Sequence, residues 1–400
     1  MKKYIYIASL VFLSACSDND NIIDERIDDS TCRPADPSCL ISSVEDYIDV
    51  AEDGTEMPAT RANMLGTSFE PGDMMRLRIT APFVDYTEYG ESTWSGSYDN
   101  WRLFEWHSAD EDNNPAKTGR WYYLGYTFGS STSKHSSEFD INNDYYPSNA
   151  PGDIYMPQAT PYVFTATTWT EEIRHIIPKA NAGGTSILSF SNVFKADQRR
   201  KENYKSSDVL WAQSYVETGS ENVFLNFQHK MAALIVTVDP THFHFYNSNN
   251  AEELVLTLEN MPDIDQQEVV IGNGYYKNTS NYNGNYKDMQ RSGCDKADNG
   301  KVLGICYVNQ SEGKIERKAF TALDQTGIYT AYRVTSTSDY TGFTDGAIQF
   351  MLIIPPYTVP LGITPTLCLR QGHDRWKAEL PLTSNRTFES GKRYSVTMKK

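Results

Sequence analysis

The sequence lacks the short motifs that identify most enzymes and nucleic-acid-binding proteins. It has no Gly-x-Ser-x-Gly nucleophile elbow, no Gly-rich phosphate-binding loop and no Cys-x-x-Cys pair. Lys and Arg never form a block interleaved with aromatic residues, and the formal net charge is −16, so we expect no nucleic-acid partner. We therefore expect no catalytic residues, no cofactor and no metal site, and we expect that the protein is not an enzyme.

Histidine is too scattered to predict a metal site. Of the seven histidines, His242 and His244 are spaced to share one strand face, and no third ligand stands beside them. We interpret them as a polar pair on a strand. His229 falls at a break in the most strand-like stretch of the chain, where a polar contact at a bend is a better interpretation than catalysis.

Long charged helical patterns are missing as well, and aromatic residues make up 12% of the chain, a composition that favours β structure. The chain is organised around residues 223–238. Val223, Leu225 and Phe227 face one side of this stretch, which is continuously apolar over residues 231–236. The pattern predicts a half-covered strand that runs into a fully buried one, with other strands on both sides.

Further strand patterns lie before and after this stretch, separated by Gly, Pro, Asn and Asp. The first places Met75 and Leu77 on a buried face and Arg76 and Arg78 in solvent. Many short strands without helical periodicity predict an all-β fold of two β-sandwiches, at residues 62–218 and 219–400. The central strand could close the first sandwich or open the second. The other strands are expected within residues 121–128, 162–169, 254–258, 269–271, 302–308, 328–335, 348–354, 363–369, 375–382 and 388–398.

The N-terminus has the layout of a lipoprotein signal peptide. Lys2 and Lys3 precede a ten-residue apolar run, residues 4–13, which is too short to cross a bilayer. Leu13-Ser14-Ala15-Cys16 then matches the bacterial lipobox, in which the cysteine is acylated and becomes the mature N-terminus. We predict a signal peptide over residues 1–16 and a lipid anchor on Cys16. The alternative is a buried hydrophobic N-terminal strand with an incidental cysteine.

Residues 17–61 are interpreted as an acidic linker or propeptide. Residues 17–56 contain thirteen acidic and two basic side chains and no sustained period, so this segment cannot fold alone. Residues 17–20 resemble a surface-export signal, or they are an ordinary flexible tether. Arg61, followed by Ala62, lies in a polar stretch just before the first strong strand pattern, where a trypsin-like protease would cut.

The five cysteines other than Cys16 leave the disulfides open. Cys32 and Cys39 could close a small loop, and Cys294 and Cys306 could join the arms of a hairpin. Cys368 lies in an apolar strand pattern and is expected to be a small buried side chain.

Two aromatic-rich tracts, residues 86–106 and 273–285, are candidates for binding loops. Tyr supplies contact area and Asn, Ser and Gly supply adaptable hydrogen bonds in such loops. They motivate one alternative function, a non-polymerising surface lipoprotein that binds glycan or protein. The simpler interpretation is an exposed loop without a task.

Six short segments follow one another along the chain in an order typical of one family. They are Thr60-Arg61-Ala62, Phe69-Glu70-Pro71-Gly72-Asp73, Asp208-Val209-Leu210-Trp211-Ala212, Phe227-Gln228-His229-Lys230-Met231-Ala232, Met351-Leu352-Ile353-Ile354-Pro355 and Gly391-Lys392-Arg393-Tyr394. Together, behind a lipobox, they resemble the fimbrillin family of Bacteroidales pilus-subunit lipoproteins. The resemblance covers nearly the whole mature chain.

The resemblance implies two transthyretin-like sandwich domains, an outer-membrane lipid anchor, and cleavage between Arg61 and Ala62 by an Arg-specific protease. It implies assembly by β-strand addition, in which a neighbouring subunit's strand fills the groove that the released leader strand leaves. The expected partners are other fimbrial subunits and a host or bacterial surface ligand. The sequence ends at Lys400 without the further C-terminal strand of many polymerising members, which favours a tip, anchor or minor subunit.

Overall fold

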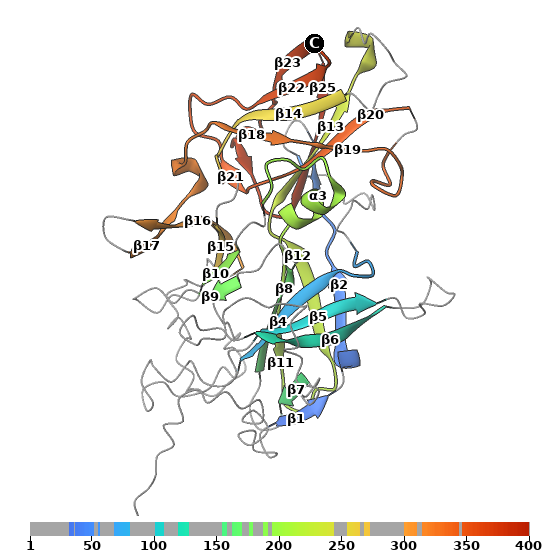
Figure 1. Cartoon of the computed structure of the whole chain (residues 1–400), viewed down its shortest axis with the longest axis vertical. Helices are drawn as coiled ribbons and strands as arrows, with labels where there is room; N and C mark the ends of the chain where they lie inside the picture. Colours follow the sequence, from blue (N-terminus) through green and yellow to red (C-terminus); the bar gives the residue numbers. More distant parts are fainter. Residues whose placement is uncertain are drawn as a thin grey trace, which may run out of the picture.

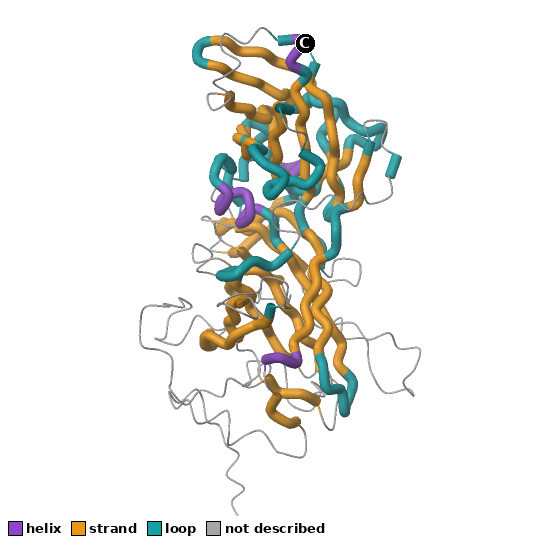
Figure 2. The backbone as a smooth tube through the Cα atoms, turned by 90° about the vertical axis from the view of Figure 1, so that its right-hand side faces the viewer, coloured by secondary structure: helices purple, strands orange, loops and turns teal. Residues whose placement is uncertain are grey.

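Strands form most of the structure, and the helices are few and short (Figure 1). In this computed structural model the strands gather in two regions stacked along the long axis, as Figure 1 and Figure 2 show from two sides. The described helices are α3 (Lys201–Ser207), η1 (Pro37–Cys39), η3 (Pro240–His242) and η8 (Phe320–Ala322). The structure describes residues 32–35, 37–51, 55–56, 68–80, 101–107, 119–127, 154–157, 162–169, 176–178, 187–190, 194–243, 254–264, 268–272, 300–309, 314–343 and 346–399.

The lower region is built on one sheet that curls until its two edges meet. In order across the sheet the strands are β2 (Leu40–Val44), β12 (Val223–His229), β11 (Leu210–Val216), β8 (Tyr162–Trp169), β4 (Met74–Thr80), β5 (Trp101–His107) and β6 (Arg120–Thr127). Nε1 of Trp121 in β6 donates a hydrogen bond to Oγ of Ser42 in β2 at 2.7 Å. The sheet thereby encloses an apolar core that includes Phe104, Phe164 and Phe227. We call this the lower core.

The upper region is a sandwich of two sheets around a second apolar core, the upper core. One sheet has the order β19 (Tyr332–Arg333), β20 (Ile348–Ile354), β13 (Ala232–Val238), β25 (Lys392–Met398) and β3 (Ile48–Val50). The other has the order β18 (Gly327–Thr330), β14 (Leu254–Met261), β22 (Thr366–Gln371) and β23 (Asp374–Glu379). Leu234 and Val236 of the first sheet belong to the same buried cluster as Leu256 and Leu367 of the second. Two facing sheets with a shared core are the sandwich that the strand-rich sequence predicts.

Smaller sheets flank these two regions. Beside them lies a sheet of order β17 (Lys314–Lys318), β16 (Val302–Asn309), β15 (Glu268–Gly272), β10 (Ile187–Phe190) and β9 (Ile176–Pro178) (Figure 1). Two further pairs are β1 (Cys32–Ala35) with β7 (Ile154–Pro157), and β21 (Tyr357–Thr358) with β24 (Thr387–Phe388). The five-stranded sheet thus joins segments from distant parts of the sequence.

The central stretch forms two strands and connects the two cores. Buried and exposed residues alternate strictly along β12, whereas β13 is buried at every residue except Thr237. β12 belongs to the lower sheet and β13 to the upper one, so the chain passes from one core to the other between His229 and Ala232. The prediction of an all-β fold is confirmed, and so is the break at His229. The division of the chain at residue 218/219 stays a prediction.

Some details predicted from the sequence are wrong. Arg76, expected in solvent, is 1% exposed, and burial lowers its pKa to about 9. The tract 86–106, interpreted as a loop, ends in strand β5, in which Leu103 and Phe104 are buried. His242 closes a 3-10 helix and does not lie on a strand. Residues 40–44 and 48–50, which lie in the segment interpreted as linker or propeptide, form strands in both regions; that interpretation of residues 17–61 stays a prediction.

Candidate functional site

The N-terminal part of the chain covers one edge of each region. β2 is the edge strand of the lower sheet and pairs in parallel with β12, in a register from Leu40↔Val223 to Val44↔Phe227. β3 is the edge strand of the upper sheet and pairs in parallel with β25. We call residues 40–50 the N-terminal strand pair, and β12 with β25 the receiving edge. One short segment therefore completes sheets in both regions; Figure 1 labels its lower strand, β2.

The lower half of this contact is held by burial and by polar contacts at its rim. Leu40 is 5% exposed in the lower core, whereas Ile41 next to it is 45% exposed. Ser43 Oγ donates to Asn226 Oδ1 at 2.9 Å, and Asn226 Nδ2 donates to a carboxylate oxygen of Glu45. The backbone N–H of Glu45 donates to the carbonyl of Phe227 at 2.8 Å. These contacts fix the register of β2 on β12.

At the junction between the regions, Tyr47 enters a buried polar cluster. Its hydroxyl donates to Oδ2 of Asp208 at 2.7 Å, and Nδ1 of His229 lies 2.6 Å from the same oxygen. The rings of Tyr47 and His229 stack, with centroids 3.8 Å apart. Asp208 is the C-cap residue that directly follows α3, and His229 is the last residue of β12. Burial, and then the neighbouring Asp208 carboxylate, raises the pKa of Tyr47 well above its ordinary value.

The upper half of the contact contains a buried ion pair. Arg393 in β25 donates through Nε to Oδ1 of Asp49 at 2.5 Å and through a terminal nitrogen to Oδ2 at 2.9 Å. Their side chains are 2% and 12% exposed. Burial alone would lower the pKa of Arg393, but the hydrogen bonds and the charge of Asp49 raise it. A paired guanidinium and carboxylate with this geometry recognise each other through charge and shape.

The turn before β25 ties the receiving edge together. Gly391 has φ +73°, a left-handed conformation that glycine adopts without strain. Its N–H donates to the carbonyl of Met231 at 2.9 Å, and its carbonyl accepts the N–H of Ile48 at 3.0 Å. Ser390 Oγ donates to the carbonyls of His229 and Lys230 at 3.1 and 2.9 Å. The end of β12, the start of β13 and β3 therefore meet at this one turn.

The predicted lipidation and cleavage residues lie outside the described part of the chain. This holds for Cys16, Arg61 and Ala62, and also for the candidate binding tract 273–285. In the sequence, Arg61 follows the N-terminal strand pair and precedes β4. A cut after Arg61 would leave β1, β2 and β3 joined to the rest of the protein by non-covalent contacts alone.

Sequence reasoning assigned no contact to Tyr47, Asp49, Asp208 or Arg393, although Asp208 and Arg393 lie in two of the six short segments that carry the family resemblance. It identified only the bend at His229. For Tyr47 and Asp49 the available signal was the group of β-branched and aromatic residues Val44, Tyr47, Ile48 and Val50, which stand among Glu45, Asp46 and Asp49 in the acidic segment. The many acidic residues around these positions predict a solvated segment, so no buried strand was expected there.

The cysteine predictions are tested only in part. Cys368 is 0% exposed, as expected, and its sulfur accepts a hydrogen bond from Nε of Arg375 at 2.9 Å. Cys39 is 7% exposed in the lower core, far from Cys368 in the upper sheet, so these two do not pair with each other. The pairings Cys32–Cys39 and Cys294–Cys306 stay predictions.

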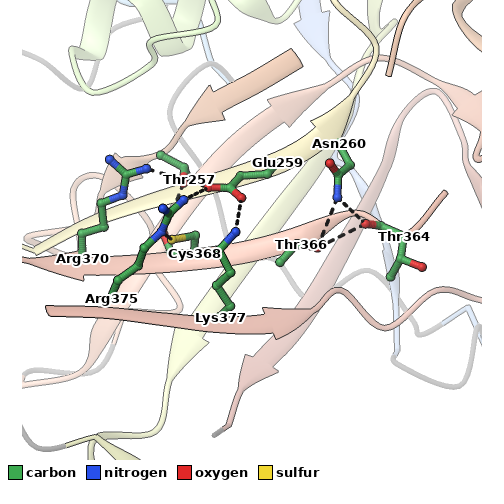
Figure 3. Close-up of polar contacts among 9 residues, drawn as sticks. All are labelled: Thr257, Glu259, Asn260, Thr364, Thr366, Cys368, Arg370, Arg375 and Lys377. Carbon is green, nitrogen blue, oxygen red and sulfur yellow. Dashed lines mark hydrogen bonds and ion pairs between the residues drawn. The ribbon is translucent and has the colours of Figure 1, made fainter. Parts of the chain in front are cut away.

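A second polar cluster lies on the face of the upper region formed by β14, β22 and β23 (Figure 3). Glu259 accepts hydrogen bonds from Arg375 at 2.5 Å and from Lys377 at 2.7 Å, and Arg370 lies 3.8 Å away. The three basic side chains are 46–50% exposed. Such cross-strand ion pairs are ordinary surface stabilisation. Among the described helices, none is long and apolar enough to cross a membrane.

Fold and site together define a class: an all-β protein whose own N-terminal strands complete sheets in two stacked regions. Residues 91–399 match the sequence pattern of the fimbrillin-like proteins, so the chain belongs to the fimbrillin-like family. Membership places the protein at the cell surface and in a structural rather than enzymatic family. The resemblance inferred from the short segments is thereby confirmed.

The chain is also similar to several solved structures of bacterial proteins. A candidate cell adhesion protein from Bacteroides ovatus is 12% identical, with 90% of this chain and 91% of that chain covered and a TM-score of 0.46. The fimbrial anchor protein Mfa2 from Porphyromonas gingivalis is 11% identical, with 85% and 82% covered and a TM-score of 0.28. A fimbrial assembly protein from Parabacteroides distasonis is 8% identical, with 82% and 84% covered and a TM-score of 0.28. No curated protein matches the sequence.

Proposed function

We propose that this protein is a subunit of a cell-surface fimbria that is assembled by β-strand addition and serves adhesion. In this proposal it is exported as a lipoprotein acylated on Cys16, anchored in the outer membrane, and cut between Arg61 and Ala62. Release of the N-terminal strand pair then opens the receiving edge for a strand of a neighbouring subunit. Two transthyretin-like domains, divided near residue 218, are part of the same proposal.

One observation supports the proposal: β2 and β3, the strands that cover the receiving edge, both precede the predicted cleavage site in the sequence. An edge strand with free N–H and C=O groups is a template for another chain. Here β12 and β25 are covered by a segment whose covalent link to the rest of the chain would be removed by a single peptide-bond cleavage. Strand addition uses such an edge, with main-chain hydrogen bonds supplying affinity.

The fate of the N-terminus tests the proposal. N-terminal sequencing of protein recovered from cells should give a start at Ala62, and unboiled samples should form SDS-resistant ladders. The matched control is Arg61→Ala, which should leave an acylated precursor that stays monomeric. A wild-type protein that keeps an acylated Cys16 and forms no ladder would instead support the non-polymerising lipoprotein, which a glycan array on the full chain would then examine.

A further inference from the structure

The N-terminal strand pair places two polar side chains inward, one at each side of the junction. Tyr47 and Asp49 are two residues apart, and Ile48 between them is 43% exposed. In an extended segment, side chains two residues apart point to the same face. The Tyr47 hydroxyl reaches Asp208 and the Asp49 carboxylate reaches Arg393. Beside the receiving edge Asp208 thus offers an acceptor, and farther along Arg393 of β25 offers a cationic donor.

Each of these groups is buried, so it discriminates among strands. Asp208 is 5% exposed and Arg393 is 1% exposed. Within the described part of the chain, Oδ1 of Asp208 has no hydrogen-bond partner, so its contacts run through the oxygen that Tyr47 shares with His229. Leaving a buried charged group without its partner costs more than the pair itself gains. A purely apolar strand could satisfy the backbone of the edge but not these two side chains.

We propose that the receiving edge selects a strand of another subunit that carries a tyrosine followed, two residues later, by a carboxylate. This rests on the proposed assembly by strand addition and names its partner. The phenol ring stacks on His229 while its hydroxyl donates to Asp208, and the carboxylate accepts the paired hydrogen bonds of Arg393. The rim contacts of Glu45 with Asn226 are exposed and contribute little selectivity.

Peptide exchange on the full chain tests the proposal without risking the fold of the host. The chain is cut after Arg61 with an Arg-specific protease. It is then incubated with a fluorescent peptide of residues 40–50, in urea at a concentration too low to unfold the protein. Variants are made only in the peptide: Tyr47→Phe, Asp49→Asn, and Ile48→Thr as the control on the exposed face. Fluorescence anisotropy gives the affinity of each, and the uncut chain gives the background.

The wild-type peptide should replace the cut segment, with Ile48→Thr within about threefold and each inward variant weaker by about tenfold or more. Equal affinities for all four peptides would overturn the selection while leaving strand addition intact. A wild-type peptide that never enters the cut chain would contradict strand addition itself, and the selection would fall with it.

Discussion

The ion pair between Asp49 and Arg393 should stabilise the uncut protein more than any surface pair does. Asp49→Asn keeps the shape of the side chain but replaces one of the two acceptor oxygens with an amide nitrogen that faces the guanidinium. Because the Arg393 side chain is 2% exposed, water cannot replace the lost contact. Removing one partner of a buried pair costs about 3–5 kcal/mol. We expect a loss of that size in the free energy of unfolding.

Urea unfolding followed by circular dichroism and tryptophan fluorescence measures this loss. The matched control is Asp197→Asn, which breaks a contact of equal length, 2.5 Å to Arg199, between side chains 50% and 59% exposed. An exposed pair contributes roughly 0–1 kcal/mol. If Asp49→Asn costs no more than Asp197→Asn, the upper region does not depend on β3, and the reasoning about the receiving edge is refuted.

Further perturbations address the junction and the surface. Burial lowers the pKa of Lys230 to about 8 from 10.5. The buried positive charge therefore destabilises the folded protein below pH 8, and this destabilisation disappears as the pH rises to about 10.5. Lys230→Met should accordingly raise the free energy of unfolding, measured in urea, by roughly 1–3 kcal/mol at pH 7 and by much less at pH 10.5. Gly391→Ala should lower the free energy of unfolding by about 1–2 kcal/mol because residue 391 has a left-handed backbone, and Gly219→Ala, at φ +81°, should lower it by a similar amount. After cleavage at Arg61, only Gly391→Ala should make the N-terminal segment dissociate faster, as followed by gel filtration. Burial alone would raise the pKa of Glu259, but hydrogen bonds from Lys377 and Arg375 lower it; Glu259→Gln should thus cost up to about 1 kcal/mol at pH 7, and a pH series should show this difference fading as acid protonates the wild-type carboxyl.

The β architecture could be predicted because the pattern of apolar and polar residues over a few neighbouring positions determines which side chains of a strand are buried. β12 alternates with period two and β13 is continuously apolar, and the structure has both where they were expected. The turn Glu70 to Asp73 was also predictable, and the N–H of Asp73 donates to the carbonyl of Glu70 at 2.9 Å. Short-range patterns therefore identify strands and turns that are covered by a large core.

The receiving edge could not be predicted because its contacts span almost the whole chain. Asp49 and Arg393 are 344 residues apart, and Tyr47 and Asp208 are 161 apart. Nothing near Asp49 in the sequence indicates a buried partner, and an Asp in an acidic segment is normally in solvent. Arg76 misled for the same reason: its alternation with Met75 and Leu77 predicts an outward side chain, yet other parts of the chain bury it.

Cleavage alone does not empty the receiving edge. Cys39, Leu40, Tyr47 and Val50 are each at most 7% exposed, and burial of one such apolar side chain stabilises by roughly 1.5–3 kcal/mol. Backbone pairing with two strands and the ion pair add to this. A total near 10 kcal/mol corresponds to a dissociation constant of about 50 nM, so the cut segment stays bound without a covalent link.

An incoming strand must therefore displace the cut segment progressively. Because β2 and β3 lie on opposite sides of the junction, a strand that starts at β12 meets the Tyr47 cluster before it reaches Arg393. The incoming strand must therefore satisfy Asp208 and His229 before the bound segment loses its final contact, the ion pair between Asp49 and Arg393.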